Sequence, residues 1–334
     1  MSLTIDDLAN GRTCLLLGAG ASRPYGFPLW NDLKDKIASV LEEASDPWMK
    51  QKEEVAKGAF ERVKDRLGQM PGDCTIDEYI EQSVETDSGE FEQFMRRAIA
   101  LVLVRAEARD SDNSRKGWVE VLANAIADRH KETLATTLTI ISFNYERCFQ
   151  FRLDRALHCE LRGSKPVDRP LEGSFQLSIT YPHGHLGSLV GLDLNWQVSA
   201  ATYGQDSVAA HYGQANYETN LQTLSSLRTV DSMIAVSGRK GAGHAYEQAN
   251  HHLANCTRAL VVGMSPQGFL TAMLNPFDGG KTVYLSTGED EYKPYLEGDN
   301  GLDARLGGAP ACFLDQYADE LMASLLEDRF ESSA

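Results

Sequence analysis

Paired cysteines, long apolar runs and an excess of basic residues are all missing from this sequence of 334 residues. Its six cysteines are dispersed, and no two have the Cys-x-x-Cys spacing. We therefore expect free thiols in a cytoplasmic protein, with neither a disulfide framework nor a cysteine-ligated zinc site. The longest apolar run covers residues 98–104, whereas a membrane-spanning helix needs about 20 apolar residues. The polar, acidic N-terminus lacks the pattern of a signal peptide.

The charge balance is acidic, with 48 acidic against 32 basic side chains and a net charge of −16. Such a surface repels phosphate backbones, so we expect neither nucleic acid nor a membrane as a direct partner. The 42% hydrophobic content is typical of a globular protein. The length is enough for one large domain or for a domain with an insertion.

Short apolar runs predict buried strands, which cover residues 13–17, 139–142, 175–180, 233–236, 259–262 and 282–285. Helical patterns alternate with these runs at residues 29–45 and 244–255, and an amphipathic pattern from Phe313 to Leu325 predicts a further helix. Strands that alternate with helices indicate an α/β fold. We expect a Rossmann-like, mostly parallel sheet with helices on both faces.

Residues 48–132 have a different character, because helical patterns dominate there and no strand pattern is convincing. One helical pattern covers residues 91–102 and another covers residues 118–126. We therefore predict an α/β domain formed by residues 1–47 and 133–334, with residues 48–132 as a helical insertion.

The sequence Gly-Ala-Gly-Ala-Ser at residues 18–22 follows the first predicted strand and precedes a helix. In such a turn, backbone N–H groups and the helix dipole favour a diphosphate at the helix N-terminus. The glycines also let the backbone turn tightly and let a ligand approach closely. The dinucleotide fingerprint G-x-G-x-x-G is incomplete, because Arg23 occupies the position of the third glycine. A tight strand–helix turn without a ligand is the alternative.

Polar residues also follow two other predicted strands, and in an open α/β sheet ligands bind outside these carboxyl ends. Asn144 follows the second predicted strand, although asparagine is also a preferred N-cap, here for a helix over residues 145–153. His183 follows the third, and its His-x-His spacing with His185 leaves metal binding as an alternative.

Gly263-Met264-Ser265 ends the strand predicted at residues 259–262. A serine nucleophile elbow would have the pattern G-x-S-x-G. That pattern is excluded here, because Gln267 occupies its fifth position and no histidine follows His252. A buried strand that ends in small residues is the other interpretation.

These segments, in this order, resemble the motifs of the Sir2 (sirtuin) family. Residues 18–22 with Gly26-Phe27-Pro28 resemble the motif GAG-x-S…G-[IF]-P. Residues 139–146 resemble T-x-N-x-D, with Glu146 in place of the aspartate. The His-Gly pair at His183 and the G-x-S segment at Gly263 resemble two further motifs of the family. The resemblance covers residues 13–45 and 136–290.

The resemblance implies a role for each residue. Asn144 and His183 would be catalytic, the asparagine at the ribose carbon and the histidine as a general base. The turn that contains Phe27 and Pro28 would help to shape the nicotinamide pocket. The residues that would bind NAD are Gly18, Ala19, Gly20, Ser22, Phe27, Pro28, Tyr145, Gly263 and Ser265. No metal is expected, because the two Cys-x-x-Cys pairs of the zinc module in deacylating sirtuins are missing.

Sir2-like proteins without zinc resemble NAD hydrolases of bacterial antiphage defence, so we expect a hydrolase that releases nicotinamide and ADP-ribose. Residues 75–81 are similar to a segment of these defence proteins, although Thr75 and Glu78 also have the spacing of a capping box. The resemblance implies control by a homo-oligomer or by a partner such as a helicase-like ATPase or an Argonaute. The alternatives are a non-catalytic module that binds NAD or ADP-ribose, and a zinc-free deacylase.

Overall fold

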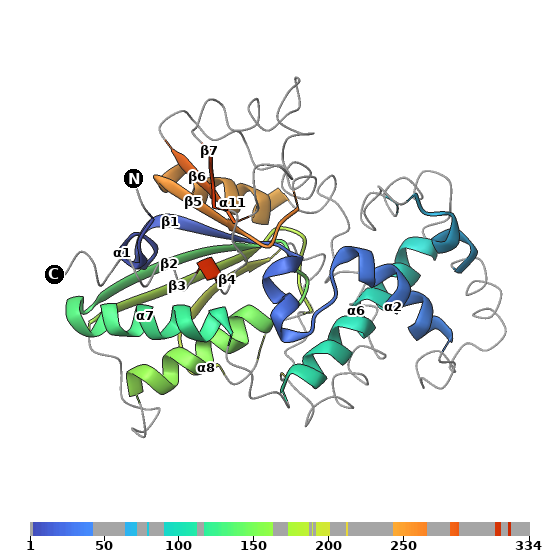
Figure 1. The fold of residues 1–334 in the computed structure, drawn as a ribbon, viewed down its shortest axis with the longest axis horizontal. Helices are drawn as coiled ribbons and strands as arrows, with labels where there is room; N and C mark the ends of the chain where they lie inside the picture. The colour runs from blue at the N-terminus through green and yellow to red at the C-terminus, as the bar shows by residue number, and fades with distance from the viewer. Residues whose placement is uncertain are drawn as a thin grey trace.

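The computed structural model describes residues 3–42, 64–71, 79, 90–111, 117–162, 173–186, 189, 192–200, 212, 243–265, 281–286, 311–314 and 320–321 (Figure 1). The strand expected at residues 233–236 and the capping box expected at Thr75 and Glu78 lie outside these residues. Within the described part of the chain, no helix combines the length and the hydrophobicity that crossing a membrane requires.

Seven parallel strands form one sheet in the order β4-β3-β2-β1-β5-β6-β7 (Figure 1). The strands are Asn10–Leu17 (β1), Ala135–Ser142 (β2), Ser174–Tyr181 (β3), Trp196–Ala200 (β4), Arg258–Val262 (β5), Thr282–Leu285 (β6) and Ala311–Phe313 (β7). Every apolar run that was predicted as a strand, and that lies within the described residues, belongs to this sheet. The predicted α/β fold with a parallel sheet is confirmed.

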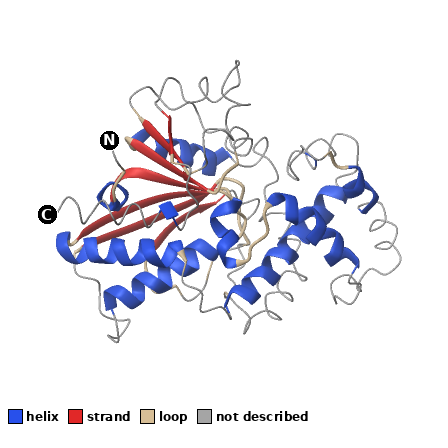
Figure 2. Cartoon of the chain, in the orientation of Figure 1, coloured by secondary structure: helices blue, strands red, loops and turns tan. Residues whose placement is uncertain are grey.

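Helices cover both faces of the sheet. Successive strand residues point to opposite sides, so each face has its own apolar cluster. Leu15 and Leu17 of β1 belong to an apolar cluster that includes residues of α1, α7 and α8. Cys14 and Leu16 belong to a second cluster that includes residues of α11. The four helices are Ile5–Ala9 (α1), Trp118–Thr133 (α7), Cys148–Arg162 (α8) and Gly243–Asn255 (α11). Figure 2 shows the strands between these helical layers.

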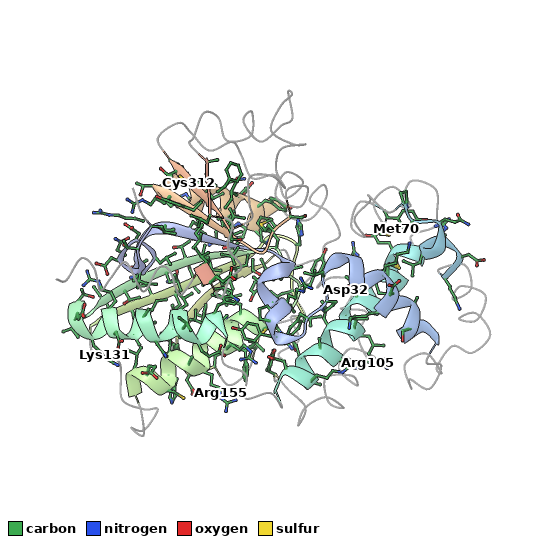
Figure 3. The ribbon with its side chains drawn as sticks, in the orientation of Figure 1. Asp32, Met70, Arg105, Lys131, Arg155 and Cys312 are labelled. Atoms are coloured by element: carbon green, nitrogen blue, oxygen red, sulfur yellow. The ribbon has the colours of Figure 1, made fainter. Side chains whose placement is uncertain are left out.

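Helix α7 packs against α8 and β2, although all of it except Thr133 lies within residues 48–132, the segment that was predicted as an insertion. The outer sides of these two helices carry exposed charges such as Lys131 and Arg155 (Figure 3). This part of the segment therefore contributes to the helical layer over the sheet. The domain boundaries themselves stay a prediction.

Beyond the carboxyl ends of the strands, α2 (Trp30–Glu42) packs against α6 (Glu90–Ser111) (Figure 1). The predicted helix at residues 29–45 corresponds to α2. The glycine turn does not lead straight into this helix, because a 3-10 helix, η1 (Ala19–Tyr25), comes first. Gly26 ends η1 in the left-handed conformation with φ of 87°, which lets the chain turn towards α2.

Two edge elements differ from the sequence prediction. Strand β4 was not predicted, because its residues are exposed or half-buried and give no apolar run. Phe313 was assigned to a helix but lies in β7, where it pairs with Leu285 of β6. The backbone hydrogen bonds offered by the edge of β6 outweigh the helical periodicity at this point. Glu320 and Leu321, further along, are helical.

Candidate functional site

The carboxyl end of β1 lies at the point where the strand order reverses, with β2 on one side and β5 on the other. In parallel α/β sheets, ligands bind at this edge and at this switch point. The segments that leave five neighbouring strands at this edge carry Gly18, Asn144, His183, Gly263 and Ser286. The fold therefore brings the predicted motifs to one edge of the sheet.

The glycines of the first motif permit a close contact between the ends of β1 and β5. The Gly18 amide donates to the Val262 carbonyl at 3.0 Å, and the Gly20 amide donates to the Gly263 carbonyl at 2.8 Å. Gly263 has φ of +67°, and a Cβ there would lie 2.0 Å from the Ala21 amide nitrogen. A Cβ on Gly18 would lie 2.6 Å from the Gly263 carbonyl oxygen. These positions require glycine for backbone packing alone.

This packing engages two of the amides that were expected to hold a diphosphate. The Gly20 amide donates to the Gly263 carbonyl just after β5, and the Ala21 amide donates to the Gly18 carbonyl at 3.0 Å. Both amides thus hold the shape of the turn. Ala19 is half-buried, whereas the Arg23 side chain is exposed.

Asn144 is held against the glycine turn by its side-chain amide. Its Nδ2 donates to the Gly18 carbonyl at 3.0 Å and to Glu146 Oε1 at 3.0 Å, with Ser22 Oγ at 3.3 Å. A carbonyl and a carboxylate only accept hydrogen bonds, so this network assigns Nδ2 to their side and turns Oδ1 away from them. The alternative N-cap role is wrong, because the helix begins at Cys148 and not at Tyr145.

Glu146 is the carboxylate at the centre of this site and is only 5% exposed. Ser22, 3% exposed, donates to its Oε1, and the Cys148 amide donates to its Oε2. The Ser22 hydroxyl, which was expected to bind the nucleotide, thus bonds to the protein. Burial raises the pKa of Glu146 to about 7, although these hydrogen bonds oppose the shift. The charge of Glu107 on α6 raises the pKa further.

His183 lies at the same edge as Asn144. Its ring makes an edge contact with Phe143 at a centroid distance of 5.3 Å and a tilted contact with Tyr145 at 6.1 Å. These two aromatic residues flank Asn144 in the sequence. The His183 Nε2 also forms a 2.7 Å hydrogen bond with the Tyr246 hydroxyl of α11. The structure therefore places His183 against the two residues that flank Asn144 in the sequence, at the same edge of the sheet.

His185 differs from His183 in its surroundings, because it is buried and packs edge-on against Tyr181 at 4.6 Å. Among the residues that the structure describes, no three His, Cys, Asp or Glu side chains are grouped so that they could hold a metal ion. The metal alternative for the His-x-His pair therefore has no further ligand in this part of the chain.

The other residues that were predicted to contact NAD come from the chain after the glycine turn and from the end of β5. Phe27 and Pro28 are buried after Gly26, and the Phe27 amide donates to the Ser22 carbonyl at 3.4 Å. Ser265 is exposed just beyond β5. Because the edges of β1 and β5 are hydrogen-bonded neighbours, these residues frame the same end of the sheet.

A buried polar network lies behind the site and joins it to α6 and α7. Arg147 pairs with Glu107 of α6 at 2.6 Å, and Arg152 pairs with Asp110 of α6. The Trp118 indole of α7 donates to the Ala21 carbonyl of η1 at 2.7 Å. This network holds η1, on which Ser22 lies, and the start of α8, which follows Glu146 closely in the chain.

Sequence reasoning missed three residues of this region. Ser286 follows β6 and its hydroxyl accepts from the Gly263 amide at 3.4 Å, so the strand-end rule would have found it. Tyr246 lies on a helix that precedes a strand, and Glu107 lies 40 residues before its partner. No local pattern in the sequence indicates either pairing.

No protein-family model matches this sequence. No curated protein matches it at a significant level either. The functional interpretation therefore depends on the residues and their arrangement.

Proposed function

We propose that this protein is an NAD glycohydrolase, which cleaves the bond between nicotinamide and ribose and releases nicotinamide and ADP-ribose. The observation that carries the proposal is the arrangement at one edge of the sheet, where Asn144 bonds to the glycine turn after β1 and His183 contacts Phe143 and Tyr145 on either side of Asn144 in the sequence. This switch point is where parallel α/β sheets bind their ligands. The order of the motifs, which resembles the Sir2 family, supports NAD as the substrate.

The proposed chemistry uses Asn144 and His183 in turn. When the bond breaks, its electron pair moves to the nicotinamide ring nitrogen, so nicotinamide leaves as a neutral molecule and positive charge develops on the ribose. We assign Asn144 Oδ1 to stabilise this charge and to hold the attacking water. His183 accepts one proton from that water as its oxygen bonds to the ribose carbon, and then releases the proton to solvent.

The glycine turn supports this proposal with fewer available backbone amides than the sequence predicted. The Gly20 amide bonds to the Gly263 carbonyl just after β5, and the Ala21 amide bonds to the Gly18 carbonyl within the turn. We therefore assign nucleotide contacts to the more accessible positions at this edge, Ala19 and Ser265. Positioning of the scissile bond next to Asn144 is then the main contribution of the turn.

The same resemblance supports a role as an NAD-depleting effector of antiphage defence. Uncontrolled NAD hydrolysis would kill the host cell, so we propose that assembly or a partner protein controls the activity. A homo-oligomer, a helicase-like ATPase or an Argonaute are the candidates that the resemblance suggests.

Chromatography of NAD, nicotinamide and ADP-ribose tests the proposal with the purified protein. Asn144→Ala and His183→Ala should each lower kcat by about 100-fold or more, the scale expected for positioned polar and acid–base groups. His183→Ala keeps the hydrogen bonds between Asn144 and Gly18, so it remains informative if Asn144→Ala folds poorly. His185→Gln is the matched control, because it changes the same residue type two positions away and should leave kcat nearly unchanged.

Full activity of both alanine variants would contradict the assignment of these residues. NAD binding without any turnover by the wild-type protein under all conditions, including with a candidate partner protein added, would contradict the hydrolase and support a non-catalytic module that binds NAD or ADP-ribose. Calorimetry with ADP-ribose, run beside the chromatography, separates these results.

A further inference from the structure

The Glu146 carboxylate receives hydrogen bonds from three separate parts of the site. Its Oε1 accepts from the Ser22 hydroxyl of η1 and, at 3.0 Å, from Asn144 Nδ2. Its Oε2 accepts from the Cys148 amide, the first residue of α8. With 5% of the residue exposed, water has little access to replace these bonds. The carboxylate therefore links the glycine turn, the β2 end and the α8 start.

Above about pH 7 the Glu146 carboxylate is ionised and has no hydrogen to donate, and this property fixes the side-chain amide of Asn144. If the amide were rotated by half a turn, its Oδ1 would face two acceptors, the Glu146 carboxylate and the Gly18 carbonyl. Unpaired polar atoms in such a buried place are costly, so the rotated state is disfavoured. Glu146 and Gly18 thus select one of the two amide orientations.

We infer that Glu146 is a positioning residue, which acts by holding the Asn144 side-chain amide with its oxygen turned towards the reacting ribose. The inference rests on the proposed function, because it takes Asn144 as the residue at the ribose carbon. Glu146 itself does not touch the substrate in this account. Its three donors occupy both carboxylate oxygens on the protein side.

Replacement of Glu146 by glutamine keeps the size of the side chain but adds an NH₂ group. If that group faces Asn144 Nδ2, two donors oppose each other and the Asn144 amide loses one acceptor. If it faces the Cys148 amide instead, two donors oppose each other at the start of α8. Glu146→Asp keeps an acceptor-only carboxylate, although it is one methylene shorter. The aspartate variant should therefore restore part of what the glutamine variant loses.

The experiment combines kinetics with NMR of the Asn144 side chain in protein labelled with ¹⁵N-asparagine, assigned by comparison with Asn144→Ala. Glu146→Gln should lower kcat by roughly 10-fold to 100-fold and should shift the Asn144 NH₂ signals or speed their exchange with water. Calorimetric affinity for ADP-ribose should change less than kcat. Glu146→Asp should lie between wild type and Glu146→Gln in both measurements, and it replaces the glutamine variant if that variant does not fold.

Asp154→Asn is the matched control. Asp154 is another buried carboxylate, on α8, and it accepts from the Asp193 and Leu194 amides and from the Trp196 indole at the amino end of β4. This variant should lower stability, yet it should leave the Asn144 signals and kcat as in wild type. Equal effects of Asp154→Asn and Glu146→Gln on the Asn144 signals would overturn the inference.

The outcomes separate the inference from the proposed function. Unchanged Asn144 signals in Glu146→Gln would overturn the positioning role, whatever the activity. Changed signals with a lower kcat would support it. Changed signals in a protein that does not cleave NAD even as wild type with a candidate partner protein added would overturn the proposed function and would support only the link from Glu146 to Asn144.

Discussion

Loss of the Glu107 charge should destabilise the protein strongly, because it would leave Arg147 charged and buried. Both side chains are 1% exposed. Glu107 accepts from Arg147 at its backbone amide (3.2 Å), Nε (3.1 Å) and Nη2 (2.6 Å). Burial by itself lowers the pKa of Arg147, but the Glu107 charge outweighs it and the net pKa is raised. Arginine is effectively always protonated in proteins, so the guanidinium stays charged even when its partner is absent.

The magnitude follows from this burial. Removal of one partner of a buried ion pair costs about 3–5 kcal/mol, a large part of the roughly 5–15 kcal/mol that stabilises a typical domain. Glu107→Gln should therefore lower the free energy of unfolding by about 3 kcal/mol or more. The double variant Glu107→Leu with Arg147→Met removes both charges together. It should be more stable than Glu107→Gln, since an apolar pair needs no partner charges.

Urea unfolding, followed by tryptophan fluorescence to which buried Trp118 contributes, measures these changes. Asp128→Asn is the control, because its ion pair with Lys131 is exposed and an exposed pair contributes about 1 kcal/mol at most. A loss below about 1 kcal/mol for Glu107→Gln would refute the reasoning. So would a double variant that is less stable than Glu107→Gln.

Two further predictions concern Gly263 and Glu146. Gly263→Ala should lower the free energy of unfolding by about 2 kcal/mol or more in urea titrations, because its positive φ and the nearby Ala21 backbone both oppose a Cβ. Gly26→Ala, where φ is also positive but no atom lies within 4 Å of the added Cβ, should cost less, and equal losses would contradict this account. Folding raises the pKa of Glu146 from 4.5 to about 7, so the folded protein keeps a proton that the unfolded chain has lost. Wild type should therefore lose about 3 kcal/mol of stability relative to Glu146→Gln as pH rises from 4.5 to 7, and a constant difference would refute the raised pKa.

The central strands could be predicted from the sequence because burial on both faces gives continuous apolar runs. β6 has the bounds that were predicted, and β5 begins one residue earlier, at Arg258. The edge strands lacked this signal. Trp196–Ala200 is half-exposed, and the three residues of β7 are too few to show a period. Their strand conformation depends on neighbours that the sequence does not reveal.

The site could be predicted only in part. Asn144 and His183 were found because polar residues after apolar strands occupy the carboxyl edge of a parallel sheet. The contacts of Ser22 and Glu146 were not foreseen, since 124 residues separate them in the chain. The glycine pattern also suggested free amides, whereas contact with Gly263 engages the Gly20 amide. Tertiary packing decides which backbone amides of the turn remain available to a ligand.

A crystal structure of the His183→Ala variant with NAD would test the central claim most directly. We predict that the nucleotide lies at the carboxyl edge between β1 and β5, and that the ribose carbon bonded to nicotinamide contacts Asn144 Oδ1. The space left by the imidazole should open onto the same carbon. NAD bound elsewhere on the protein, or a ribose carbon remote from Asn144, would contradict the account.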